Sequence, residues 1–207
     1  EAVSLIWYLE NVFYHSVPKI YNYVQHHIYD GNPIDNQIID LGFWPGGDRD
    51  GNPFVTPKIT LDVAERLRQT ILRNYYRDVR RLKRRYTFDG VQEILVRIEK
   101  RLYKHVVRSY SKVNFSQKIL LEELEKARKI IVDNHQSLFV EELNDFINKV
   151  RIFGFHFATL DIRQDSRVHH DAFTQIVADL QKIGDTTFPE NYIHLSPEEQ
   201  VEILSVV

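Results

Sequence analysis

The chain has 207 residues, a formal net charge of -2, and 43% hydrophobic and 27% charged residues, a composition typical of a globular protein with a sizeable core. It contains no cysteine, which excludes disulfides, thiolate catalysis and cysteine-ligated zinc. No stretch approaches the roughly 20 unbroken apolar residues that a membrane-spanning helix needs, and no basic-then-apolar leader is visible, so we expect a cytoplasmic protein without membrane contact.

The first elements alternate between helix and strand. Apolar residues at three- and four-residue steps predict a long helix over residues 1–30, which Pro18 would bend. Residues 37–56 are expected to hold a short buried strand and then a loop, because three Gly and two Pro fall within residues 44–53. The expected buried stripe of the first helix is Ile6, Leu9, Val12, Phe13, Ile20, Val24 and Ile28.

The middle of the chain, residues 57–153, is predicted to be a helical region. Thr56 or Thr60 caps the first of its helices, and Gly154 breaks the pattern after the last. The charge of this region is uneven, since residues 58–112 hold 16 Lys and Arg against 6 Asp and Glu, while the rest of the chain holds 11 against 23. This split predicts either an anion-binding face or charge pairing within the molecule.

The last part of the chain repeats the order of strand, loop and helix. Residues 155–166 are expected to form a second buried strand and a short loop, because the run 155–162 is aromatic and β-branched. Residues 167–207 are predicted to be helical, with one helix starting at Ser166 and another at the capping box of Ser196 and Glu199.

Two isolated strands do not make a stable sheet by themselves. They fit as two staves of a parallel barrel whose other strands come from elsewhere, and in such barrels the chemistry lies on the loops that follow the strands. Here those loops are residues 44–53 and 163–166. The sequence therefore points to these two loops as the place to look for function.

Both loops resemble signatures of one enzyme family. Residues 44–56 read W-P-G-G-D-R-D-G-N-P-F-V-T and resemble the W-x-G-G-D-R-D-G-N-P-x-V-T signature of phosphoenolpyruvate carboxylases, which is long and highly specific. Residues 161–169 read D-I-R-Q-D-S-R-V-H and resemble the moderately specific D-I-R-Q-E-S-x-x-H of that family. The departures are Pro45, where a bulkier apolar residue is usual, and Asp165, which replaces Glu. The resemblance covers essentially the whole chain.

This resemblance implies a mainly α fold with two short strands, a slice of the carboxylase α/β barrel with its long surrounding helices. It implies a carboxy-lyase that adds bicarbonate to phosphoenolpyruvate to give oxaloacetate and phosphate, with Mg²⁺ or Mn²⁺. Such an enzyme fixes carbon dioxide and supplies the tricarboxylic acid cycle. The parent enzyme would be a cytoplasmic homotetramer.

The chain is expected to be one internal fragment of that enzyme, spanning residues 1–207. It contains no Met and stops within an apolar-periodic run. The resemblance places the family's H-P-T-E segment before this chain, and the metal-binding carboxylates and remaining arginines after it. No metal ligand is therefore expected in this fragment, and the isolated fragment is expected to be inactive.

The resemblance also implies roles for individual residues. Arg163 would bind the phosphate or carboxylate of the substrate, because guanidinium forks suit a multiply charged anion. Trp44 would be an apolar wall that shields the enolate and carbon dioxide from water. Next to these two, the expected catalytic group includes Asp48, Arg49 and Asp50, which either brace Arg163 or contact the substrate, with bracing favoured. The expected substrate-binding residues are Arg163, Gln164, Gly46, Gly47 and Asn52.

Other interpretations stay open beside these. The basic run 77–85 would suit a nucleic acid, but its helical spacing favours a solvated or salt-bridged helix face. The alternative is a sugar-phosphate effector site, which the resembled family often has. No nucleic-acid partner is expected. The spacing of Asp48, Asp50 and Asn52 imitates a calcium loop, yet Pro53 and Ile59 stand where that loop needs Gly and Glu. For the whole chain, the alternative is a non-catalytic helical anion-binding or scaffold module.

Overall fold

The computed structural model describes residues 1–32, 34, 38–50, 52–107, 115–184, 187–189 and 191–205. Small parts of the expected segments, such as residues 37 and 51, lie outside the described residues. The chain divides into two compact units, Glu1–Gly47 with Phe54–Asp161 and Asp48–Pro53 with Ile162–Val207. The fold class expected from the sequence is confirmed, since the described residues are mainly α-helical with two short strands.

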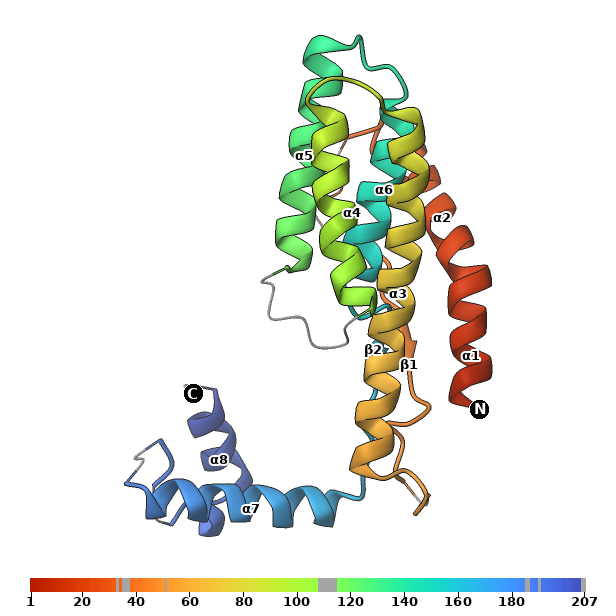
Figure 1. The fold of residues 1–207 in the computed structure, drawn as a ribbon. Helices are drawn as coiled ribbons and strands as arrows, with labels where there is room; N and C mark the ends of the chain where they lie inside the picture. The colour runs from red at the N-terminus through yellow and green to blue at the C-terminus, as the bar shows by residue number, and fades with distance from the viewer. Residues whose placement is uncertain are drawn as a thin grey trace. The chain divides into compact units, whose positions relative to one another are not determined.

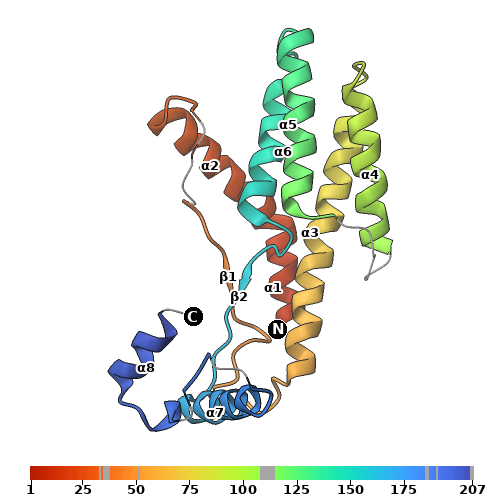
Figure 2. The ribbon, with the colours of Figure 1, turned by 90° about the vertical axis from the view of Figure 1, so that its left-hand side faces the viewer.

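The first helical segment of the larger unit has three parts: α1 (Ala2–Tyr8), a π-helical turn (Leu9–Phe13) and α2 (Tyr14–Ile28). Figure 2 shows that α2 leaves the line of α1. The π-helical turn lies between the two, and Pro18, which cannot donate a backbone hydrogen bond, lies inside α2.

The π-helical turn also corrects the face that was expected to be buried. A π-helical turn holds one residue more than an α-helical turn, so every later side chain moves to another face of the helix. Ile6, before the turn, and Leu9, at its start, are buried as expected. The prediction is wrong for the rest of the stripe, because the side chains of Val12, Phe13, Ile20 and Ile28 are exposed. The residues that face the core instead are Tyr14, Val17, Pro18 and Tyr21.

Four long helices form a bundle in the same unit: α3 (Pro57–Arg85), α4 (Val91–Val107), α5 (Gln117–Asn134) and α6 (Val140–Phe153). Figure 1 shows α3 beside α4, and Figure 2 shows this pair and also α5 beside α6. Thr56 and Ser116 cap α3 and α5, because each side-chain oxygen accepts a backbone N–H of the first turn. The buried core of the bundle includes Leu67, Ile71, Leu72, Val79, Leu95, Ile98, Leu102, Leu120, Leu124, Ile131 and Val150.

Aromatic side chains join α2 to the bundle. The ring of Tyr14 stacks on Phe153 with centroids 5.5 Å apart and meets the edge of Phe157 at 6.1 Å. Tyr75 of α3 contacts Phe146 of α6 in an edge-to-face geometry at 5.7 Å. Such pairs add specific geometry to the burial of large apolar surfaces, so they help to fix how α2 and α3 pack against α6.

The two strands are parallel, as the sequence led us to expect. Strand β1 (Gly42–Phe43) pairs with β2 (Thr159–Leu160) in the register Gly42 with Thr159 and Phe43 with Leu160. Both strands are shorter than the apolar runs suggested. Part of the reason is Phe157, a buried residue with φ of 70°, because this left-handed conformation interrupts an extended backbone.

The smaller unit contains α7 (Ser166–Lys182), a 3₁₀ turn (Tyr192–His194) and α8 (Pro197–Leu204). Its core is a cluster of Val177, Phe188 and Tyr192, against which Phe173 and Ile203 pack. The side chains of Ser196 and Glu199 form the expected capping box of α8. No helix among the described residues is long and apolar enough to cross a membrane.

Candidate active site

The loop after β1 begins with a tight turn that only glycine can make. The Gly47 N–H donates to the Trp44 carbonyl at 2.9 Å, and Gly46 has a φ of +88°. A Cβ on Gly46 would lie 2.7 Å from Val63 Cγ2, and the Gly46 carbonyl accepts a 2.7 Å hydrogen bond from Thr60 Oγ1. The first residues of the loop are thus fixed against the start of α3.

Gly47 packs directly against the backbone that follows β2. A Cβ on Gly47 would stand 2.0 Å from the carbonyl oxygen of Asp161, a distance that no real side chain tolerates. The backbone of residue 161 is itself held by β1, since the Asp161 N–H donates to the Phe43 carbonyl at 2.9 Å. Both glycines therefore have a packing reason, and their contact with a substrate stays a prediction.

Trp44 is about half exposed, with 48% of its surface accessible, so it is not a core tryptophan. An exposed indole on a loop is able to serve as an apolar wall for a ligand. Trp44 belongs to the larger unit and Arg163 to the smaller one. The expectation that both face one substrate therefore remains a prediction.

Within the smaller unit, the two family-like motifs meet. Asp48 and Arg163 form an isolated parallel bridge, and the Arg49 N–H donates to the Arg163 carbonyl at 2.8 Å. The Asp48 carboxylate also faces the guanidinium, with Asp48 Oδ2 4.0 Å from Arg163 Nη1. The side chain of Arg163 is 59% accessible and that of Asp48 34%. The arginine expected to bind substrate is thus held at its backbone while its side chain reaches solvent.

The rest of the first motif forms local turns around this contact. Asp48 Oδ1 accepts the Asp50 N–H at 3.2 Å, and the Asn52 N–H donates to the Arg49 carbonyl at 3.2 Å. Asp side chains favour such turns because their oxygens reach the backbone two residues ahead. Asp50 and Asn52 are exposed in this arrangement, and Arg49 is partly buried.

The second motif ends in the cap of α7. Gln164 Oε1 accepts the Asp165 N–H at 3.0 Å, and Asp165 Oδ1 accepts the Arg167 N–H at 2.8 Å. The Arg167 side chain also pairs with both oxygens of the Asp165 carboxylate, which lowers the pKa of Asp165 and raises that of Arg167. Sequence reasoning missed this pair, although an acidic residue just before a helix is a signal for an N-cap.

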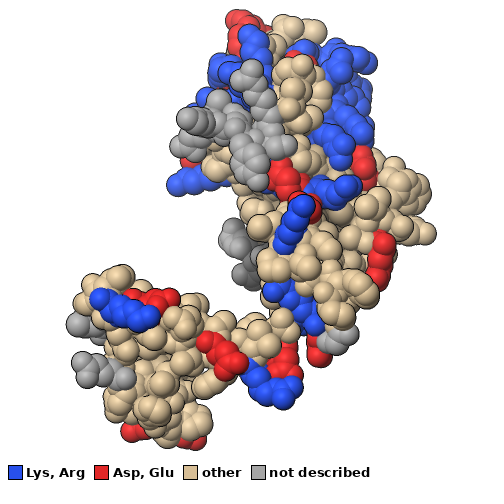
Figure 3. Space-filling model, turned by 60° about the horizontal axis from the view of Figure 1, so that its bottom comes forward, with Lys and Arg blue, Asp and Glu red and all other residues tan. Residues whose placement is uncertain are grey.

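The basic region of α3 is largely paired with carboxylates of neighbouring elements. Figure 3 shows Lys and Arg gathered over the helix bundle with Asp and Glu among them. In the run 77–85, ion pairs join Arg77 to Glu10 at 2.8 Å and Arg80 to Glu99 at 3.7 Å. Further pairs are Arg81 with Asp78, Lys83 with Glu99 and Arg85 with Glu142. These contacts support a salt-bridged helix face.

A polar cleft of about 370 Å³ lies elsewhere in the larger unit, between α2, α5 and α6, and no residue of either motif lines it. Its polar groups bind one another: Asn148 Nδ2 donates to Asn22 Oδ1 at 2.9 Å and to Gln25 Oε1 at 3.1 Å. This network explains the cleft as a polar contact between α2 and α6.

We also tested whether the residues could hold the metal that the resemblance implies. Among the described residues, no three His, Asp or Glu side chains gather closely enough to bind a metal ion. Within the two loops, Asp48 and Asp165 each have an arginine beside them. The described residues therefore do not fit a metal site.

Comparison with known proteins agrees with the motifs. The family model described as phosphoenolpyruvate carboxylase matches residues 1–119 and 97–206. A phosphoenolpyruvate carboxylase of Rhodothermus marinus is 28% identical over 86% of this chain and 24% of its own length. The enzyme of Nitrosomonas eutropha is 28% identical over 97% of this chain and 26% of its own length. That of Thermosynechococcus vestitus is 25% identical over 99% of this chain and 25% of its own length.

The chain thus spans about a quarter of the length of the curated relatives it matches. The family model covers both motif loops and the helices between them. The chain therefore belongs to the phosphoenolpyruvate carboxylase family.

Proposed function

We propose that this chain is part of an enzyme that adds bicarbonate to phosphoenolpyruvate to give oxaloacetate and phosphate. The observation that carries the proposal is the pairing of Asp48 with Arg163, because it joins the two motifs that the family model covers. Together the family match and this pairing favour a carboxylase over a scaffold module, which would not need a guanidinium held at its backbone and open to solvent.

The reaction needs three changes of bonding. An oxygen of bicarbonate attacks the phosphorus of phosphoenolpyruvate, and the bond from phosphorus to the enol oxygen breaks, which gives carboxyphosphate and the enolate of pyruvate. Carboxyphosphate then divides into carbon dioxide and phosphate, and the enolate carbon attacks carbon dioxide to form the new carbon–carbon bond. Negative charge is present throughout, so fixed cationic donors stabilise each stage.

Arg163 is proposed to bind the phosphate or the carboxylate of phosphoenolpyruvate. Its guanidinium offers several N–H donors in one plane, which match an anionic oxygen pair better than an ammonium group does. Gln164, next to it, is proposed to contact the same substrate, together with the backbone at Gly46 and Gly47 and the side chain of Asn52. Arg49 and Asp50 are proposed to shape the loop around this anion.

Trp44 is proposed to cover the enolate. An enolate is quenched by a proton from water, so an apolar wall beside it favours capture of carbon dioxide over protonation. The half-exposed indole is compatible with this role.

The remaining parts of the proposal concern the parent enzyme. It is proposed to be a cytoplasmic homotetramer that uses Mg²⁺ or Mn²⁺ bound by residues outside this chain. The 207-residue chain alone is proposed to be inactive, because it spans about a quarter of its curated relatives.

The test uses an active carboxylase that contains these residues. We expect Arg163→Ala to raise the KM for phosphoenolpyruvate about 100-fold or more, because a charge-assisted contact to a dianion is lost. Arg128→Ala is the matched control, since Arg128 is also a partly exposed arginine beside a carboxylate, 3.5 Å from Glu125, but lies outside both motifs. If substrate affinity and activity survive Arg163→Ala, the site assignment is wrong.

A further inference from the structure

The contact between Asp48 and Arg163 has two parts with different consequences. The backbone part is the parallel bridge and the 2.8 Å bond from the Arg49 N–H to the Arg163 carbonyl, which fixes where the main chain of Arg163 lies. It does not fix the side chain, because an arginine has several rotatable bonds beyond its Cα. The orientation of the guanidinium must come from contacts of the side chain itself.

The Asp48 carboxylate is itself held in place. Its Oδ1 accepts the backbone N–H of Asp50 at 3.2 Å, which closes a turn and fixes the plane of the carboxylate. Its Oδ2 faces Arg163 Nη1 at 4.0 Å. The Asp48 side chain exposes 34% of its surface to solvent, whereas the Arg163 side chain exposes 59%. A carboxylate held by its own turn therefore stands beside a guanidinium whose side chain is more exposed.

We propose that Asp48 is a positioning residue that orients the Arg163 guanidinium toward the substrate anion. This inference rests on the proposed function. A guanidinium carries five N–H donors, more than one carboxylate oxygen accepts, so a substrate phosphate and Asp48 are able to share the same group. Asp48 does not touch the substrate in this account, and it acts through Arg163.

Loss of the Asp48 charge should affect kcat and KM differently. Removing the Asp48 charge loosens the guanidinium, which weakens the aligned contacts of the transition state. The same change also removes a negative charge that opposes the substrate anion, which offsets part of the loss in ground-state binding. The result is a fall in kcat with a much smaller change in KM.

Asp48→Asn is the suitable variant, because the amide keeps an oxygen for the Asp50 N–H and the size of the side chain. In an active carboxylase that contains these residues, we expect kcat to fall about tenfold and the KM for phosphoenolpyruvate to change less than about threefold. The matched control is Asp171→Asn, which removes the same charge from an exposed position on α7. We expect the control to stay within about twofold of the unmodified enzyme.

A double-mutant cycle decides whether Asp48 acts through Arg163. In an Arg163→Ala background, Asp48→Asn should change kcat by less than about twofold, because its target is gone. A similar loss in both backgrounds, or an Asp48→Asn enzyme that matches the control, would overturn the inference. Loss of helical circular dichroism in Asp48→Asn would overturn it too, because the carboxylate would then serve folding. Failure of the proposed function looks different: Arg163→Ala by itself would leave the KM for phosphoenolpyruvate and the activity unchanged, and both ideas would fall.

Discussion

Gly47 shows how one residue decides the geometry of the loop. A methyl group there would stand 2.0 Å from the Asp161 carbonyl oxygen and 2.9 Å from its carbon, and neither atom can move without breaking the strand pairing. Backbone atoms give way less easily than side chains, so the clash has to be relieved by separating the two segments. Gly47→Ala is expected to lower the free energy of unfolding by at least about 2 kcal/mol.

The control for this prediction is Gly42→Ala in β1. A Cβ on Gly42 would meet the Asp161 carboxylate at 3.5 Å, which is an ordinary contact. We expect its effect to stay within about 0.5 kcal/mol. Urea unfolding followed by circular dichroism measures both variants, and equal midpoints for the two would show that the close approach at Gly47 does not matter.

The sequence identified the residues of the candidate site but not their contacts. The two motifs named Asp48 and Arg163, yet only the structure shows that they are paired across a bridge. Spacing along a chain carries no information on which loop residue meets which, because that depends on the register of β1 and β2. The glycines were expected to make room for a ligand, whereas the structure shows that Gly46 makes room for Val63 and Gly47 for Asp161.

At the scale of elements, a buried charged group ties three helices together. Asp78 of α3 is only 8% exposed, and its Oδ2 accepts hydrogen bonds from Tyr14 of α2 and Lys149 of α6, both at 2.8 Å. The Lys149 ammonium also lies 4.5 Å from the Tyr14 ring centroid. Burial and the nearby Asp78 raise the pKa of Tyr14 well above its ordinary value, so its hydroxyl stays a donor.

Asp78→Ala is expected to destabilise the bundle by about 3–5 kcal/mol, because it leaves the Lys149 ammonium buried without its carboxylate. The control, Glu125→Ala, removes a half-exposed carboxylate that pairs with Arg151 at 2.9 Å, and should cost only about 1 kcal/mol or less. Thermal or urea unfolding compares them. A loss below about 1 kcal/mol for Asp78→Ala would contradict the account. Asp78→Leu combined with Lys149→Met and Tyr14→Phe, which removes the buried hydroxyl as well, should recover most of the stability.

Helix starts were readable from the sequence where a side chain caps them, as at Thr56 and Ser196. The π-helical turn and the lengths of the strands escaped prediction because neither has a residue-level signal. The π-helical turn over Leu9–Phe13 follows from how the segment packs, and it moved the buried face by one residue. The short strands likewise reflect the absence of further partners for β1 and β2 among the described residues, since an apolar run becomes a long strand only where neighbours pair with it.

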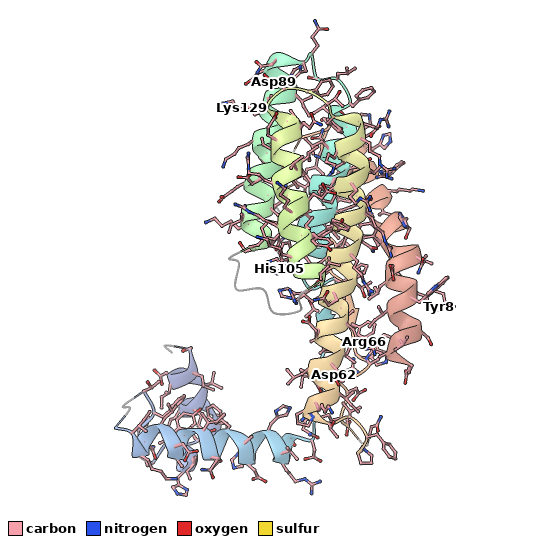
Figure 4. The ribbon with its side chains drawn as sticks, viewed as in Figure 1. Tyr8, Asp62, Arg66, Asp89, His105 and Lys129 are labelled. Atoms are coloured by element: carbon pink, nitrogen blue, oxygen red, sulfur yellow. The ribbon has the colours of Figure 1, made fainter. Side chains whose placement is uncertain are left out.

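At the scale of the whole molecule, the first helical segment is apolar on both faces. One face packs on the bundle through Tyr14, Val17 and Tyr21, while the other leaves Trp7 55% and Ile20 57% exposed. Figure 4 shows that Tyr8 of the same segment points away from the bundle. Large exposed apolar patches favour association with another surface.

The 207-residue chain is therefore expected to self-associate, which sedimentation velocity at two concentrations measures. Trp7→Lys combined with Ile20→Lys should shift the protein toward the monomer. Val132→Lys is the control, because Val132 is a similarly exposed apolar residue on α5, away from this face. A single monomeric species for the unmodified chain at both concentrations would contradict this expectation.

The central claim is that the two motif loops bind one substrate anion. A crystal structure of a carboxylase that contains these residues, with phosphoenolpyruvate bound, measures this directly. We predict a guanidinium nitrogen of Arg163 within about 3 Å of a phosphate or carboxylate oxygen, and the Trp44 ring against the methylene carbon. An ordered loop with the substrate bound away from Arg163, or with Trp44 and Arg163 on different sides of the protein, would contradict the claim.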